Sequence, residues 1–289
     1  MTSSKASSAA PLDRTTSTRV SATHQTATPW FSLHQPLSRV RFVGLAIAVF
    51  LTLIAFWWAA SESGLLPEIF LPSPGAVVER LILLASNGTL ATDIGVSLWR
   101  ISLAFLISTT MAIVLGVLAG RYDFWRAITE PLVDFIRYMP VVAFVPLTIL
   151  WTGTDEFQKL LVIWIGTFFQ QVLMIMDAVK RVPEDFIGLG RTLGLSNRRI
   201  LLRVVLPSAL PDIWDATRIC LGWAWTWLVL AELVASNSGM GYRIVVSQRY
   251  FQTDTIIGYI LLLGLLGLIT DQLMRGVGRF LFRYQKEAH

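Results

Sequence analysis

Long stretches without a charged residue constrain this sequence more than any other feature. A helix that crosses a bilayer needs about 20 predominantly apolar residues, and five stretches free of Asp, Glu, Lys and Arg reach or approach this length. They are residues 42–61, 101–120, 138–154, 160–176 and 255–270. A sixth stretch, 214–235, carries Asp215 and Arg218 near its start and Glu232 near its end. We therefore expect an all-α integral membrane protein with six transmembrane helices.

The composition excludes a soluble domain. Of the 289 residues, 54% are hydrophobic and 15% are charged, whereas soluble domains carry about 25% charged residues. The mean hydropathy is +0.60, so the net charge of +5 bears on membrane orientation rather than on nucleic-acid binding. The single cysteine, Cys220, can form no disulfide within the chain. His24, His34 and His289 lie in the tails, so we expect no metal site and no catalytic residue.

The basic residues predict the orientation. Most of the 24 Lys and Arg residues lie in the two terminal segments and in the loops after the second and fourth expected helices. Basic residues favour the cytoplasmic side, which places both termini there. Residues 1–40 are rich in Ser, Thr and Ala and lack apolar periodicity, which predicts a disordered cytoplasmic tail ahead of a six-span domain at 41–289.

The longest expected cytoplasmic loop, residues 180–210, has a helical pattern. Pro183 followed by two acidic residues is typical of a helix start. Phe186, Leu189 and Leu193 then recur at i, i+3 and i+7 and form one narrow apolar stripe. The loop is therefore expected to begin with a short amphipathic helix.

Glycine and proline shape the rest of this loop. Gly190 and Gly194 leave a thin backbone face, and Gly194 is placed to end the first helix. Ser196 predicts the cap of a second, arginine-rich helix, which we expect to end at Pro207 and Pro211. The pattern by itself fits either a rigid projection or an amphipathic segment on anionic lipid.

The spacing of Gly194, nine residues, and then Val204, Leu206 and Pro207 resembles the EAA loop of ATP-binding-cassette (ABC) importer permeases. The E-A-A positions themselves hold Gly188-Leu189-Gly190, so the usual charged contact is missing. The resemblance implies that residues of this loop couple the chain to a partner ATPase. They are Phe186, Leu189, Gly190, Leu193, Gly194, Leu206 and Pro207.

Other stretches between about residues 65 and 280 resemble the same family. A proline-punctuated pattern similar to its third span comprises Pro131, Arg137, Pro140, Ala143, Pro146, Leu147, Trp151 and Gly153. The segment from Ala231-Glu232 to Gly239-Met240-Gly241-Tyr242 resembles its fifth-span exit. Leu71-Pro72-Ser73-Pro74 and Ser97-Leu98-Trp99-Arg100 are similar to the subgroup that moves nitrate, sulfonates, taurine and bicarbonate.

The resemblance implies the transmembrane domain of a type I ABC importer in a bacterial inner or plasma membrane. The chain would be the permease subunit for a small organic or inorganic anion. Its expected partners are a second permease copy, a cytoplasmic ABC ATPase dimer, an extracytoplasmic solute-binding protein and membrane lipid, with no nucleic acid. The chain has no Walker A motif, so Mg-ATP is expected on the ATPase and no cofactor on this chain. The resemblance thus implies a transport subunit and not an enzyme.

Polar and aromatic residues at membrane depth are candidates for the transport pathway or a gate, because such groups are costly in lipid and need a reason to be there. The candidates are Arg137, Gln170, Gln171, Trp225 and Glu232. Each has a structural alternative. Arg137 could snorkel to the interface, and the glutamines could join helices by hydrogen bonds. Trp225 could be an ordinary core or interface residue, and Glu232 could be structural.

Two other functional classes remain open from the sequence. A secondary transporter requires inverted repeats, broken helices and an ionisable relay at the midplane, and no internal repeat is visible. A membrane scaffold protein needs no chemistry of its own. Neither requires a stiff helix pair in the loop at 180–210, which favours the permease. Within that class, a cofactor precursor is the alternative cargo to an anion.

Overall fold

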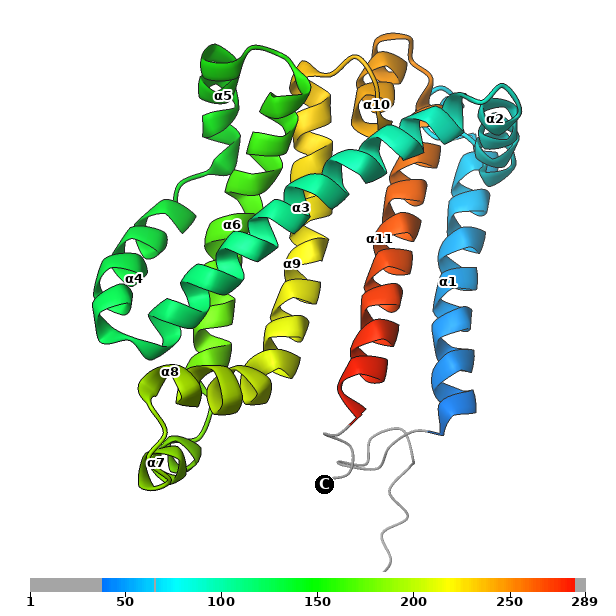
Figure 1. Ribbon diagram of the computed structural model, residues 1–289. Coiled ribbons are helices and arrows are strands. Elements are labelled where there is room, and N and C mark those ends of the chain that lie inside the picture. The colour runs from blue at the N-terminus through cyan, green and yellow to red at the C-terminus, as the bar shows by residue number, and fades with distance from the viewer. Residues whose placement is uncertain (1–37, 65, 284–289) are drawn as a thin grey trace, which may run out of the picture. The chain divides into compact units, whose positions relative to one another are not determined.

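The computed structural model describes residues 38–64 and 66–283, and every regular element in these ranges is a helix (Figure 1). The expected tail at 1–40 lies almost entirely outside the described residues. The chain divides into two compact units, Met1–Thr52 and Leu53–His289. The boundary falls within α1 (Arg39–Glu62), which is long and apolar enough to cross a membrane.

The second unit contains four more helices that are long and apolar enough to cross a membrane. They are α3 (Thr89–Arg121), α6 (Glu156–Lys180), the helix that runs from 197 into α9 (Leu206–Ala235), and α11 (Thr253–Leu281). With α1 this gives five candidate spans, or six if a bent helix pair counts as one span. The expected number of six is reached only through that pair.

The bent pair corrects the expected third span at 138–154, which is not one straight helix. It comprises α4 (Asp123–Arg137), followed by η1 (Val141–Phe144) and α5 (Val145–Thr152), with an angle of 89° between the two parts. Pro140 stands in the break with an extended backbone. Proline has no N–H to continue a helix and disfavours the helical conformation of the residue before it.

Short helices lie at the two ends of the second unit (Figure 1). At one end, the α10 end, are α2 (Pro74–Ser86) and α10 (Met240–Arg249). At the opposite end, the α7 end, α7 (Glu184–Thr192) and α8 (Asn197–Ile200) project from the long helices. The hydroxyl of Ser73 accepts a hydrogen bond from the Ala76 amide at 3.2 Å and so caps α2.

The second helix of the loop does not end at Pro207 and Pro211, which corrects the sequence expectation. Instead α8 passes through a π-helical turn, η2 (Leu201–Val205), directly into α9. Pro207 directly follows the π-helical turn, and such a turn is one of the local adjustments by which a membrane helix accommodates a proline. Pro211 lies inside α9 and is buried, and a membrane helix accommodates such a proline when its neighbours pack around it.

The contact between α3 and α6 depends on small residues. A Cβ atom on Gly116 would lie 2.8 Å from Cγ2 of Ile175, and one on Gly120 would lie 2.8 Å from Cβ of Val179. Buried Ala112 continues this face one turn earlier. Because lipid supplies no hydrophobic drive between helices, such close backbone approach is a main source of their association.

Candidate functional site

The termini of α7 follow from local sequence. Pro183 precedes the helix, and two acidic residues occupy its first turn, where they favour the positive end of the helix dipole. At the other end, Gly194 adopts a φ of 72°. Its amide donates to the Arg191 carbonyl at 2.9 Å, and the Leu195 amide donates to the Gly190 carbonyl at 3.0 Å. This pair of bonds is a Schellman motif, so Gly194 ends α7 as the sequence predicted.

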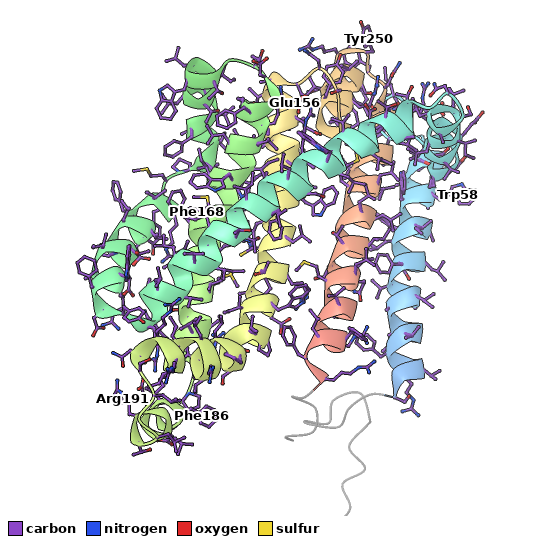
Figure 2. The ribbon with its side chains drawn as sticks, viewed as in Figure 1. Trp58, Glu156, Phe168, Phe186, Arg191 and Tyr250 are labelled. Carbon is purple, nitrogen blue, oxygen red and sulfur yellow. The ribbon has the colours of Figure 1, made fainter. Side chains whose placement is uncertain are left out.

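The two faces of α7 have different roles. On the inner face Ile187 is buried, and a Cβ atom on Gly190 would lie 3.1 Å from Cγ1 of Ile200, so Gly190 sets the close approach of the two helices. On the outer face the apolar stripe is exposed. The exposed fractions of Phe186, Leu189 and Leu193 are 48%, 61% and 70%. Figure 2 shows Phe186 at the α7 end. An exposed apolar stripe on a projecting helix is typical of a surface that a partner covers.

The remaining loop residues tie α7 to the long helices. Leu206 is half-buried and packs against the core cluster that contains Val205 and Ile200. Pro207 is exposed at the start of α9. Arg121 at the end of α3 forms an ion pair with Glu184, with 3.2 Å between Nη1 and Oε1. Movement of α7 is therefore mechanically linked to α3 and α9.

A small pocket lies at the bend of the α4–α5 pair, with a volume of about 190 Å³. Two of the five pathway candidates, Arg137 and Gln170, line it together with Trp223 and Trp227 of α9. Nε of Arg137 lies 3.1 Å from Oδ1 of Asp134, so this guanidinium already has one anionic neighbour. The pocket, which we call the bend pocket, offers cationic and amide donors between aromatic walls.

The other three pathway candidates lie elsewhere. Gln171 is buried between helices, where it accepts from Ser108 at 2.6 Å and donates to Thr109 at 2.8 Å. Trp225 is buried and donates to the hydroxyl of Thr270 on α11 at 3.1 Å. Glu232 lies at the α10 end. In this structure each of the three makes contacts that hold helices together.

Glu232 belongs to a buried charge cluster centred on Arg100. Nη1 of Arg100 donates to Oε1 of Glu232 at 2.9 Å, while Nε and Nη2 donate to the two carboxylate oxygens of Glu156 at 2.7 and 2.6 Å. The side chain of Arg100 is 1% exposed, whereas that of Glu156 is 52% exposed. Figure 2 shows Glu156 at the α10 end. The cluster thus joins α3, α6 and α9, and one of its acids reaches the surface.

The segment after α9 completes this cluster. The amide of Gly241 donates to Oε2 of Glu232 at 2.8 Å, and the amide of Met240 donates to Ser97 at 2.9 Å. The hydroxyl of Ser97 in turn donates to Glu232 at 2.7 Å. A Cβ atom on Gly239, whose φ is 105°, would lie 2.3 Å from Oε1 of Glu232. The motif segments around Ser97, Glu232 and Gly239 therefore meet at one point of the fold.

The sequence placed Arg100 in a family motif but gave it no role. Sequence reasoning missed Glu156 and a second pair at the same end, Asp93 and Arg243. Oδ2 of buried Asp93 lies 2.8 Å from Nε of Arg243 and accepts from the hydroxyl of Tyr259 at 2.8 Å. The hydrogen bond that the guanidinium of Arg243 donates to Asp93 raises the pKa of Arg243. The signal was available, since charged residues inside or beside long apolar stretches are costly to bury and call for a partner of opposite sign.

No group of three or more His, Cys, Asp and Glu side chains suited to a metal ion occurs among residues 38–64 and 66–283.

Comparison with known proteins gives consistent matches. A family model described as "Binding-protein-dependent transport system inner membrane component" matches residues 112–283. A probable ABC transporter permease protein of Brucella abortus (strain 2308) is 36% identical over 251 residues, covering 87% of this chain and 99% of the relative. The taurine transport system permease protein TauC of Escherichia coli (strain K12) is 31% identical over 258 residues, covering 88% and 93%.

A solved structure supports the fold. The crystal structure of an amino acid ABC transporter with histidines matches with a TM-score of 0.57 at 12% identity, covering 71% of this chain and 97% of that one.

We expect Glu232→Gln to destabilise the protein far more than Glu156→Gln. Loss of the Glu232 charge leaves Arg100 with one anionic partner, Glu156, on its solvent side, and breaking a buried pair costs about 3–5 kcal/mol. Glu156 is half exposed, so water can replace it. The single buried thiol, Cys220, provides the readout, because a thiol-reactive dye labels it only on unfolding. Equal unfolding temperatures for the two variants would contradict the buried role of Glu232.

Proposed function

The chain belongs to the family of binding-protein-dependent transport system inner membrane components, and on this premise we propose that it carries a small organic or inorganic anion. It is the membrane-spanning permease subunit of an ABC importer, a transport component whose ATPase is a separate subunit. A secondary transporter is not favoured by this membership. The observation that carries the coupling proposal is the exposed apolar stripe on the projecting helix α7.

The proposed coupling runs through α7. Phe186, Leu189 and Leu193 seat in a groove of the ATPase, while the inner face of α7 stays packed on Ile200. Because α8, η2 and α9 form one continuous helix, displacement of α7 tilts α9 instead of being absorbed by a loop. This is a rigid-body transition driven by a partner.

The family implies an ATPase and a solute-binding protein as partners. We further propose that two copies of this chain form a homodimer and that an ATPase dimer, which binds Mg-ATP, docks at the α7 end. That end then faces the cytoplasm with both chain termini, and the α10 end receives the solute-binding protein outside the inner membrane. The concentration of Lys and Arg in the segments of the α7 end supports this orientation.

The proposed cargo rests on two observations. A relative 31% identical to this chain is named for transport of taurine, a sulfonate. The bend pocket places the guanidinium of Arg137 and the amide of Gln170 beside Trp223 and Trp227. A guanidinium and an amide both donate hydrogen bonds to oxyanions, and a cationic group lowers the cost of an anion at membrane depth. We therefore assign the bend pocket to the pathway.

Leu189→Asp tests the docking stripe. A charge placed in an apolar groove without a partner costs several kcal/mol, so we expect the ATPase recovered with the tagged permease to fall more than about tenfold. Leu189→Met keeps an apolar side chain of similar size and should retain the ATPase. The measurement is the ratio of ATPase to permease after purification in mild detergent. An unchanged ratio of ATPase to permease in Leu189→Asp would contradict the docking role of α7.

Arg137→Gln tests the bend pocket. Loss of the guanidinium should lower uptake of radiolabelled taurine into proteoliposomes by about tenfold, the effect of one charge-assisted hydrogen bond. Arg275→Gln, in an exposed ion pair with Asp271 on α11, is the matched control and should leave uptake within about twofold. The ATPase recovered with the permease should not change in either variant. Equal uptake by both variants would remove Arg137 from the pathway.

A further inference from the structure

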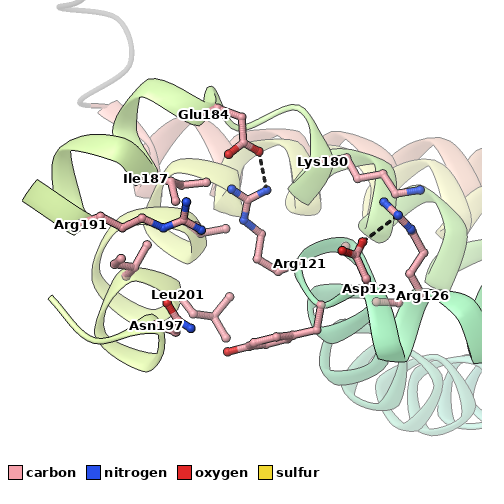
Figure 3. A pocket seen from close by; sticks show the side chains of 14 residues that line it. Arg121, Asp123, Arg126, Lys180, Glu184, Ile187, Arg191, Asn197 and Leu201 are labelled. Carbon is pink, nitrogen blue, oxygen red and sulfur yellow. Dashed lines mark hydrogen bonds and ion pairs between the residues drawn. The ribbon is translucent and has the colours of Figure 1, made fainter.

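The α7 end contains a second, larger cavity that the transport cycle described above does not use. Its volume is about 450 Å³, within the range of ligand sites. One wall is formed where α3 ends and α4 begins, and the other by α7, α8 and η2 (Figure 3). The cavity lies on the inner side of α7, away from the exposed stripe, so a docked ATPase would not fill it.

The lining of this cavity carries more positive than negative charge. Four cationic side chains, Arg121, Arg126, Lys180 and Arg191, face two acids, Asp123 and Glu184. Both acids reach into solvent, with side-chain exposures of 89% and 76%. They therefore neutralise the interior of the cavity only weakly, since exposed ion pairs are screened by water.

Two of the cations already have close partners. Arg126 lies 2.7 Å from Asp123, and Lys180 lies 3.4 Å from Glu130. Arg121 is half-buried, and its one acidic partner among residues 38–64 and 66–283 is the exposed Glu184, at 3.2 Å. Arg191 has no acidic group within ion-pair distance among the residues that the structure describes.

Arg121 and Arg191 come from opposite walls. Figure 3 shows both guanidinium groups reaching toward the same space below Glu184, and Asn197 also lines the cavity. Arg191 is exposed and Arg121 is half-buried. Two like charges that converge in a concave site raise the local positive potential and attract an anion. Guanidinium groups donate in a planar fork that matches the oxygens of a phosphate group.

The geometry points to a binding site for a phosphate-type anion between Arg121 and Arg191, which ties α7 to the end of α3. The phosphate can come from the headgroup of an anionic phospholipid or from free phosphate in solution. A bound anion would neutralise the repulsion between the two guanidinium groups and hold α7 against the long helices. The consequence for coupling, a stiffer α7, rests on the proposed function, whereas the binding itself does not.

Binding is tested with the full chain purified in a neutral detergent. One arm measures retention of radiolabelled inorganic phosphate by equilibrium dialysis. The other compares phosphatidylglycerol with phosphatidylcholine by native mass spectrometry. Retention of phosphate identifies the free anion, and retention of phosphatidylglycerol over phosphatidylcholine identifies the headgroup; either result supports the site.

Arg191→Gln should weaken the binding by about tenfold, and Arg191→Lys, which keeps the charge and loses the fork, should weaken it less. Arg198→Gln is the matched control, because Arg198 is an exposed arginine of α8 that does not line the cavity. The affinity of the Arg198→Gln variant for the anion should match that of the wild type.

The site is overturned if neither phosphate nor phosphatidylglycerol binds in preference to phosphatidylcholine. It is equally overturned if Arg191→Gln and Arg198→Gln lose binding to the same extent. Both measurements are made without the ATPase, so their failure leaves the docking of α7 untouched. A failure of docking by Leu189→Asp in turn leaves the anion site standing.

Discussion

The rest of the structure depends on the pairing of Arg100 with Glu232 and Glu156. The buried charge of Arg100 is tolerated only with partners of opposite sign, and these three residues lie on three different helices, α3, α9 and α6. Arg100 therefore fixes the relative register of the helices at the α10 end. The backbone amide of Gly241 completes the coordination of Glu232, which also determines where α10 begins. Away from this end the same helices are held by close packing at glycines such as Gly116.

The α7 end differs from the α10 end in that, within the described parts of the chain, no buried charge cluster holds it together. It has an exposed apolar stripe, a partly solvated ion pair between Arg121 and Glu184, and a cavity with unbalanced positive charge. The link between the two ends is the uninterrupted course from α8 through η2 into α9, which starts beside α7 and ends at Glu232 and Ala235. One helix thus connects the surface assigned to ATPase docking with the charge cluster at the other end.

The sequence predicted the features that depend on composition and local pattern. The apolar runs located the spans, Gly194 ended α7, and the loop spacing indicated the permease family before any comparison. It did not predict the 89° bend at Pro140, because a run of apolar residues does not reveal where a helix changes direction. Pro207 was misread as a stop, since a membrane helix continues past a proline when a local π-helical turn and packed neighbours accommodate it. The partners of Arg100 required the tertiary structure, because Glu156 and Glu232 are distant in the chain.

The α8–η2–α9 helix is proposed to transmit force between the two ends. Stimulation of ATP hydrolysis by the solute-binding protein in the reconstituted importer measures this transmission most directly. Leu202 and Arg203 are exposed residues of η2, so replacing both by glycine softens the helix, at about 1 kcal/mol per residue relative to alanine, without emptying the core. We expect the glycine pair to retain the ATPase but lose the stimulation, and the alanine pair at the same positions to keep both. Full stimulation in the glycine variant would contradict the transmission of force through this helix.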